Sequence, residues 1–159
     1  MDVTRAAVIS APSITKSSHP TVSMKIENRS PIEIRKVTSR RHLNQFLDLP
    51  QRIYADDPNW VSPLRIDVKE FLNPKKHPFL LHGEAAQFLA LQDGSPVARI
   101  LVSDDSRYNE MNRANQGCFG MFECIDDPAV AADVLNAAAD WLRARGRTLI
   151  RGPIDYSTN

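Results

Sequence analysis

The sequence predicts an α/β protein of the α+β type, in which helices flank a mixed but mostly antiparallel sheet. The clearest evidence is a hairpin signal, because two apolar, β-prone runs at 85–91 and 97–102 are joined by a turn with an Asp-Gly pair, which supplies the positive φ of tight hairpins. A helical pattern at 127–146 is followed by a strand pattern at 148–154. The expected order of elements is therefore strand, two helices, three strands, helix and strand.

The first expected strand is 32–37, where apolar and polar residues partly alternate. Ser39 is a suitable N-cap for the helix that follows. Pro50 lies within this helical pattern, and because proline lacks an amide donor we expect either a kink or a break at Pro50. A short helix is expected at 67–72. The apolar face of the first helix is formed by Leu43, Phe46, Leu47, Pro50, Ile53 and Tyr54.

The third strand of the central group is expected at 117–125, and the helix after it has Asp127 as N-cap and Pro128 as first residue. The buried stripe of that helix runs from Val130 to Leu142, and Gly146 suits the left-handed position at its end. Simple alternation would place Phe119, Met121 and Glu123 on one face of the strand, and Cys118, Gly120, Phe122 and Cys124 on the other.

The chain divides into two parts by composition. Residues 1–30 are rich in scattered Ser, Thr and Pro and show no sustained apolar period, which predicts a disordered tail. Residues 31–159 are expected to form the globular part. Since no segment follows the last strand to pair beside it, we expect this part to be the incomplete, N-terminal portion of a larger domain.

Composition and the spacing of Cys and His residues count against several classes of function and bear on the redox setting. A net charge of +1 gives no strong field for nucleic acid, and no apolar run approaches the roughly 20 residues that span a bilayer. Cys118 and Cys124 lie too far apart on one expected strand to form a disulfide, which favours a reducing, cytoplasmic setting. His77 and His82 have no Cys or carboxylate partners nearby in sequence, so no metal site is predicted.

Several short motifs carry a resemblance to a little-characterised bacterial group described as acetyltransferase-like, with the GNAT-type N-acetyltransferase fold. The order of the expected elements also resembles the front half of that fold, and the resemblance covers residues 32–159. The motifs are Asp48-Leu49-Pro50, Tyr54-Ala55-Asp56-Asp57-Pro58-Asn59-Trp60-Val61, Asn73-Pro74, His77-Pro78-Phe79, Phe88-Leu89-Ala90, Gly120-Met121-Phe122-Glu123-Cys124, and Gly152-Pro153 through Asn159.

The resemblance implies an acyl-CoA-dependent N-acyltransferase, with acetyl-CoA or another acyl-CoA as cofactor and a small-molecule amine as substrate. By position, Phe122, Cys124 and Ile125 would contact the pantetheine arm of the cofactor. The Gly-rich loop that holds the pyrophosphate in that superfamily is replaced here by Asp126, Asp127 and Pro128. Two carboxylates would repel a diphosphate at a helix N-terminus, so we expect acetyl-CoA to bind weakly or not at all.

Two residues are candidates for catalysis. Glu123 is a carboxylate in an apolar strand, and burial would suit it to accept a proton from an amine. The alternative is an ion pair with Arg99 or Arg151, or simple exposure. Tyr156 follows the last strand and would either line a cleft, together with Asn159, or belong to a loose chain end.

Three classes of function remain open. The chain is an acyl-CoA-dependent N-acyltransferase with Glu123 and Tyr156 at its catalytic site, a non-catalytic domain that binds a small molecule or a protein, or an incomplete product with no activity of its own. Resemblance favours the first class, and the missing phosphate loop counts against it.

The strand at 148–154 is expected to expose an unpaired edge, and such edges recruit other strands. We therefore predict that residues 1–159 self-associate, or are only marginally stable. Sedimentation over a concentration series, combined with thermal unfolding, tests this. A monodisperse monomer that unfolds cooperatively well above about 60 °C would contradict it.

Overall fold

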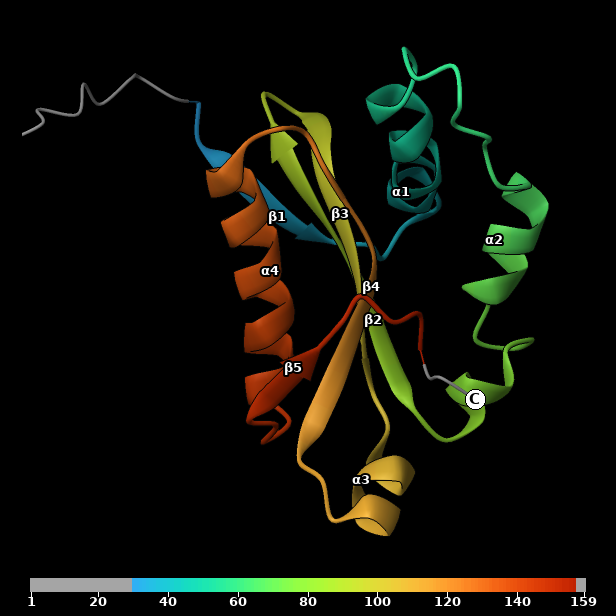
Figure 1. Cartoon of the computed structure of the whole chain (residues 1–159), viewed down its shortest axis with the longest axis vertical. Helices are drawn as coiled ribbons and strands as arrows, with labels where there is room; N and C mark the ends of the chain where they lie inside the picture. The colour runs from blue at the N-terminus through green and yellow to red at the C-terminus, as the bar shows by residue number, and fades with distance from the viewer. Residues whose placement is uncertain (1–29, 157–159) are drawn as a thin grey trace, which may run out of the picture.

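Helices cover both faces of a single five-stranded sheet in the computed structural model, which describes residues 30–156 (Figure 1). The tail expected at 1–30 lies outside the described residues except for Ser30. The elements are β1 (Ile32–Lys36), α1 (Arg40–Ile53), α2 (Arg65–Phe71), a 3-10 helix η1 (Pro78–Leu81), β2 (Glu84–Gln92), β3 (Ser95–Asp104), α3 (Ser106–Asn112), β4 (Gln116–Cys124), α4 (Pro128–Arg143) and β5 (Leu149–Arg151).

The strands lie side by side in chain order, from β1 to β5. The pairs from β1 to β4 are antiparallel, and β5 runs parallel to β4. Helix α4 lies on one face of the sheet, while α1 and α2 lie on the other (Figure 1). The predicted fold class, a mixed and mostly antiparallel sheet with flanking helices, is confirmed.

The ends of the two long helices follow their capping residues. Ser39 accepts a hydrogen bond from the backbone of His42 at the start of α1, and Asp127 caps α4 just before Pro128. Helix α1 continues through Pro50 to Ile53, so the break considered from the sequence does not occur. Pro50 instead leaves one carbonyl of the preceding turn without a helical partner, because proline has no amide to donate.

Each face of the sheet carries its own apolar cluster. The cluster under α4 has Ile100, Val102, Val130, Val134 and Leu142 among its buried members. The second cluster lies between the sheet and α1, α2 and η1, and its buried members are Phe46, Leu72, Phe79, Leu89, Leu91, Leu101 and Tyr156.

Strand β4 does not alternate simply along its length. It pairs Gly120 with Leu101 and Glu123 with Arg99, so its register shifts between these pairs, and Met121 takes a φ of +42°. As a result Phe119 packs against the α4 cluster while Met121 packs against the opposite one. The expectation that Phe119, Met121 and Glu123 share a face is therefore wrong for Phe119, because a β-bulge reverses the faces of the residues on its two sides.

The segment that follows β5 crosses β4 at this bulge. Strand β5 pairs with β4 only at residues 116–118 and ends at Arg151, not at 154 as the sequence suggested. Beyond it, the amide of Ile154 donates to the carbonyl of Phe119 at 2.6 Å, and a carboxylate oxygen of Asp155 accepts from the amide of Met121 at 2.8 Å. The segment then passes to the far face of the sheet, so that β4 beyond Met121 pairs with β3 alone among the described residues.

Gly120 makes this crossing possible. A Cβ at this position would lie 2.1 Å from a carboxylate oxygen of Asp155 and 2.7 Å from the carbonyl oxygen of Ile154. We predict that Gly120→Ala lowers the free energy of unfolding by about 2–3 kcal/mol, since the backbone of Ile154 and the carboxylate of Asp155 must move. Urea denaturation measures this. Gly94→Asn is the control, because Gly94 has a φ of +76° and open space around it, and Asn tolerates that conformation. An equal effect of the two changes would contradict the prediction.

Candidate functional site

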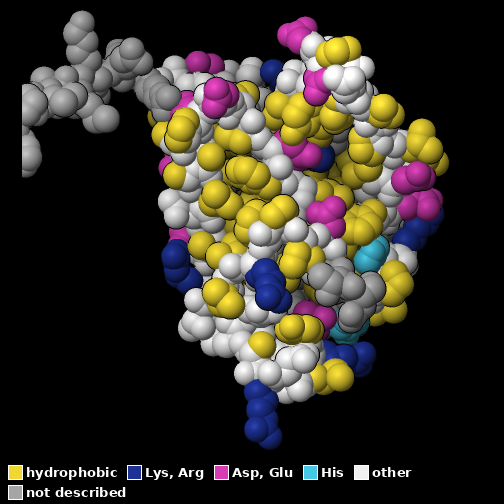
Figure 2. Space-filling view, in the orientation of Figure 1, with side chains coloured by type: hydrophobic (Ala, Val, Ile, Leu, Met, Phe, Trp, Pro, Cys, Tyr) yellow, Lys and Arg dark blue, Asp and Glu magenta, His cyan; other side chains and the backbone are white. Residues whose placement is uncertain are grey.

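An open cavity of about 760 Å³ lies where β4 separates from the chain that follows β5. The space-filling view shows hydrophobic side chains gathered between α4 and α1 on this face (Figure 2). The cavity is bounded by the C-terminal turn of α1, the start of β3, the end of β4 and the N-terminus of α4. Its lining residues are Leu49, Arg52, Ile53, Tyr54, Pro96, Phe122, Cys124, Ile125, Asp126, Asp127, Pro128 and Ala131.

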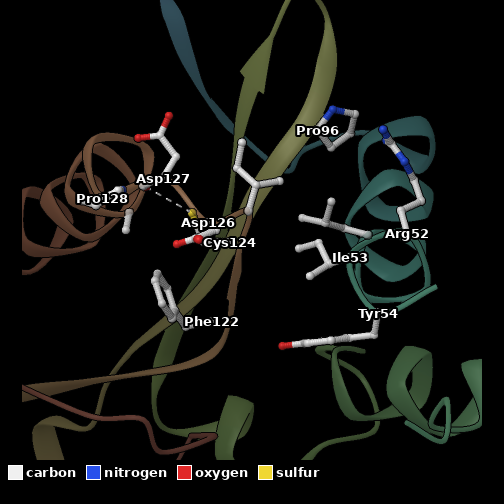
Figure 3. Close-up of a pocket in the computed structure, with 12 residues that line it drawn as sticks. Arg52, Ile53, Tyr54, Pro96, Phe122, Cys124, Asp126, Asp127 and Pro128 are labelled. Carbon is white, nitrogen blue, oxygen red and sulfur yellow. Dashed lines mark hydrogen bonds between the residues drawn. The ribbon is translucent and has the colours of Figure 1, made fainter. Parts of the chain in front are cut away.

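The end of β4 forms the middle of the cavity wall. Phe122, Cys124 and Ile125, the three residues expected from the sequence to contact a cofactor, all line the cavity. Figure 3 shows Phe122 and Cys124 at this wall. The intervening Glu123 belongs to the opposite side of the strand. Burial, and then the charges of Asp127 and Asp126, raise the pKa of the Cys124 thiol, so it stays protonated near neutral pH and is a poor nucleophile.

The N-terminus of α4 closes one side of the cavity. A carboxylate oxygen of Asp127 accepts from the amides of Ala129 at 2.9 Å and Val130 at 3.4 Å, and Pro128 has no amide to offer. The cap expected from the sequence is therefore present. With Asp126 exposed beside it, this helix end presents negative charge and occupied amides in place of the free amides that attract phosphate.

The last turn of α1 faces β4 across the cavity (Figure 3). Leu49 is 1% exposed and fixes the turn to the sheet, while Arg52 and Tyr54 reach the rim. The ring of Tyr54 stacks on Trp60, with 5.3 Å between ring centroids. Of these residues, the sequence places only Tyr54 on the apolar helix face, and helical spacing alone does not show that this face borders a cavity.

Glu123 forms a partly buried ion pair with Arg99 on the neighbouring strand. Its two carboxylate oxygens accept from the Nε and Nη2 of Arg99 at 2.5 Å and 3.1 Å. The Nη1 of Arg99 donates to the carbonyl oxygen of Phe46 in α1 at 2.7 Å. Of the pairings left open by the sequence, the one with Arg99 is confirmed, and Glu123 is not simply exposed.

Tyr156 lies in an aromatic cluster on the α2 side of the sheet. Its side chain is 2% exposed and stacks on Phe71 and Phe79, with centroid distances of 4.6 Å and 4.9 Å. Burial, with the charge of Asp155, raises its pKa to about 12. Tyr156 neither lines the cavity nor belongs to a loose end, and Asn159, expected beside it, lies outside the described residues. A catalytic role for Tyr156 stays a prediction, and Tyr156 makes no contact in the cavity that supports it.

Within residues 30–156, no group of three or more His, Cys, Asp and Glu side chains is placed to hold a metal ion. None of the helices in this part of the chain has the length and apolar character that crossing a bilayer requires.

Comparison with known proteins gives two curated relatives, and no protein-family model matches the chain. The chain is 42% identical over 124 residues to a protein named "Bacterial ceramide synthase" from Caulobacter vibrioides, and 35% identical over 126 residues to "Protein YghO" from Escherichia coli. These matches use 77% and 79% of this chain. The chain spans about a third of the length of either relative, 32% in both cases.

Solved structures match through the fold. A tandem GNAT protein from the clavulanic acid biosynthesis pathway has a TM-score of 0.56 at 16% identity, over 75% of this chain and 35% of that one. An aminoglycoside acetyltransferase from an uncultured soil metagenomic sample, in complex with sisomicin, has a TM-score of 0.55 at 11% identity, over 77% of both chains. A ribosomal-protein-alanine N-acetyltransferase from Brucella melitensis has a TM-score of 0.53 at 15% identity, over 77% of this chain and 81% of that one. The described residues therefore have the acyl-CoA N-acyltransferase fold of the GNAT acetyltransferases.

Proposed function

We propose that this chain is the N-terminal portion of an acyl-CoA-dependent N-acyltransferase. The observation that carries the proposal is the open end of β4, which faces an apolar cavity between α1 and α4 in a chain with the acyl-CoA N-acyltransferase fold. A strand without a partner on one side offers backbone groups to an extended ligand, and the pantetheine arm of coenzyme A is such a ligand. Phe122, Cys124 and Ile125 are the residues placed to contact it.

The reaction proposed is direct acyl transfer. The amine nitrogen attacks the thioester carbonyl, a C–N bond forms, the C–S bond breaks, and the amine proton leaves to a base as the thiol takes one up. Holding donor and acceptor together in one cavity converts this step into an intramolecular one. The products are an amide and free coenzyme A.

The acyl donor in this proposal is held mainly through its apolar part. Asp127 occupies the first amides of α4, and Asp126 adds a second carboxylate, so this helix end gives a diphosphate no favourable site. The cavity between Leu49, Ile53 and Phe122 is apolar by contrast. Burial of an alkyl chain would supply about 0.8 kcal/mol for each methylene group.

The similarity to a protein named ceramide synthase extends this proposal to the substrate class. A ceramide is the amide of a fatty acid and a long-chain amino alcohol. We infer that the proposed reaction joins a long-chain acyl group to a long-chain amine, and the apolar cavity and the carboxylates at its rim support this assignment.

A non-catalytic binding domain is the second candidate. It is favoured by the position of Glu123, the carboxylate expected to accept the proton, because both its oxygens are bonded to Arg99. The two candidates are separated by mass spectrometry after incubation of an acyl-CoA and a long-chain amine with the longer protein, meaning a protein that carries this chain and has the length of the curated relatives. An amide product supports the acyltransferase, and its absence supports the binding domain.

Acyl-CoA binding should depend on acyl length. We predict that acetyl-CoA binds this chain with a Kd weaker than about 100 µM, and that octanoyl-CoA binds at least tenfold more tightly, because burying two methylene groups already contributes the roughly 1.4 kcal/mol that a factor of ten requires. Isothermal titration measures both. Phe122→Asp should abolish the difference, whereas Phe71→Leu on the other face should retain it. A low-micromolar Kd for acetyl-CoA, or equal affinities, would contradict this prediction.

Glu123→Gln tests the role of this carboxylate. We predict a loss of about 3 kcal/mol in the free energy of unfolding, because the buried guanidinium of Arg99 loses its counter-charge. Thermal and urea unfolding measure the loss, with Glu33→Gln as control in an exposed pair with Arg35. Loss of turnover in the longer protein at unchanged stability would instead assign Glu123 to catalysis.

A further inference from the structure

Among residues 30–156, one hydrogen bond joins helix α1 to the sheet, and its donor is a side chain of a strand. In an α-helix the carbonyl of Phe46 would accept from the amide of residue 50, but residue 50 is a proline and has no amide hydrogen. Arg99 supplies the missing donor, with 2.7 Å between Nη1 and the carbonyl oxygen. Its guanidinium also lies 4.8 Å above the ring of Phe46. In the described part of the chain, no second hydrogen bond connects α1 to a strand.

The bonds of Arg99 connect two walls of the cavity. At one end is Glu123, whose neighbours in β4, Phe122 and Cys124, line the cavity. At the other end is Phe46, one helical turn before Leu49 and followed by Ile53 on the same wall. Arg99 itself is 6% exposed and is not among the residues that line the cavity.

We propose that Pro50 and Arg99 together fix the position of α1 relative to β4. Pro50 leaves the Phe46 carbonyl without a helical donor, and Arg99 bonds that carbonyl and so keeps the C-terminal part of α1 at a fixed distance from β4. Arg99 is thus a positioning residue for the cavity. This inference rests on the proposed function for the importance of the cavity, but the bond between the two walls exists whether or not an acyl-CoA binds there.

A double-mutant cycle tests the coupling between residues 50 and 99. The reference background is Arg99→Met with Glu123→Met, which removes both charges together, since replacing a buried pair by apolar residues of similar volume often leaves a protein folded. In this background the Phe46 carbonyl has no partner, and Pro50→Ala restores an amide donor one turn away. In the natural chain the same change only competes with a donor already present.

We expect Pro50→Ala to stabilise the Met–Met background more than the natural chain. The factor by which it lowers the unfolding equilibrium constant, measured by urea denaturation, should be at least about ten times larger in the Met–Met background. Pro128→Ala is the control, because Pro128 is the first residue of α4 and leaves no interior carbonyl unpaired. An equal effect of Pro50→Ala in the two backgrounds would overturn the proposal. The same comparison with Arg99→Leu and Glu123→Leu, which also removes both the charges and the donor, gives a second cycle if the Met–Met chain does not fold.

The positioning role is tested by the reactivity of the cavity thiol. In a Cys118→Ser chain, Cys124 is the remaining cysteine, and its alkylation by N-ethylmaleimide reports access to the cavity. The Met–Met change should raise this rate at least about threefold, because the α1 wall is released. The rate for Cys118 in a Cys124→Ser chain should not change. An unchanged ratio of the two rates, with only a lower stability, would assign Arg99 a purely structural role. Since no acyl-CoA is used, failure here is distinct from failure of the proposed function.

Discussion

The guanidinium of Arg99 satisfies two groups that would otherwise be costly to bury. The carboxylate of Glu123 lies between two cavity residues of β4, and the carbonyl of Phe46 is left open by Pro50. An unpaired buried carbonyl costs about 1–3 kcal/mol, and an unpaired buried charge costs more. Because the same side chain contacts both, the position of α1 over the sheet and the shape of the cavity depend on one residue of β3.

The cavity owes its opening to the way the chain leaves β5. The bulge at Met121 turns β4, and the amide of Met121 is held by the carboxylate of Asp155. The following residue, Tyr156, is buried among aromatic rings on the far side of the sheet. The segment after β5 therefore crosses β4 at its bulge and leaves the end of β4 without a partner among the described residues.

The N-terminus of α4 gives this site a distinct electrostatic character. In many nucleotide sites a helix N-terminus offers free amides to a phosphate. Here Asp127 takes up the first amides and Asp126 lies beside it, while the rest of the cavity is largely apolar. This helix end therefore offers a phosphate no free first amide and places two carboxylates beside an apolar lining, and the proposed preference for an alkyl chain rests on that arrangement.

Local chemistry in the sequence determined most of the secondary structure. The Asp-Gly turn, the Ser39 and Asp127 caps and the position of Pro128 each act within a few residues, so each could be recognised without the fold. The placement of Phe122, Cys124 and Ile125 at one wall came from resemblance and strand position. Tertiary structure alone decided the bulge at Met121, the burial of Tyr156 and the bond of Arg99 to α1, because each arises between segments distant in the chain. For the bond of Arg99 to α1, the one local sign in the sequence was an arginine within the apolar run 97–102. Its partner is the backbone carbonyl of Phe46, and because every residue has a backbone carbonyl, a sequence pattern does not show which one is bonded.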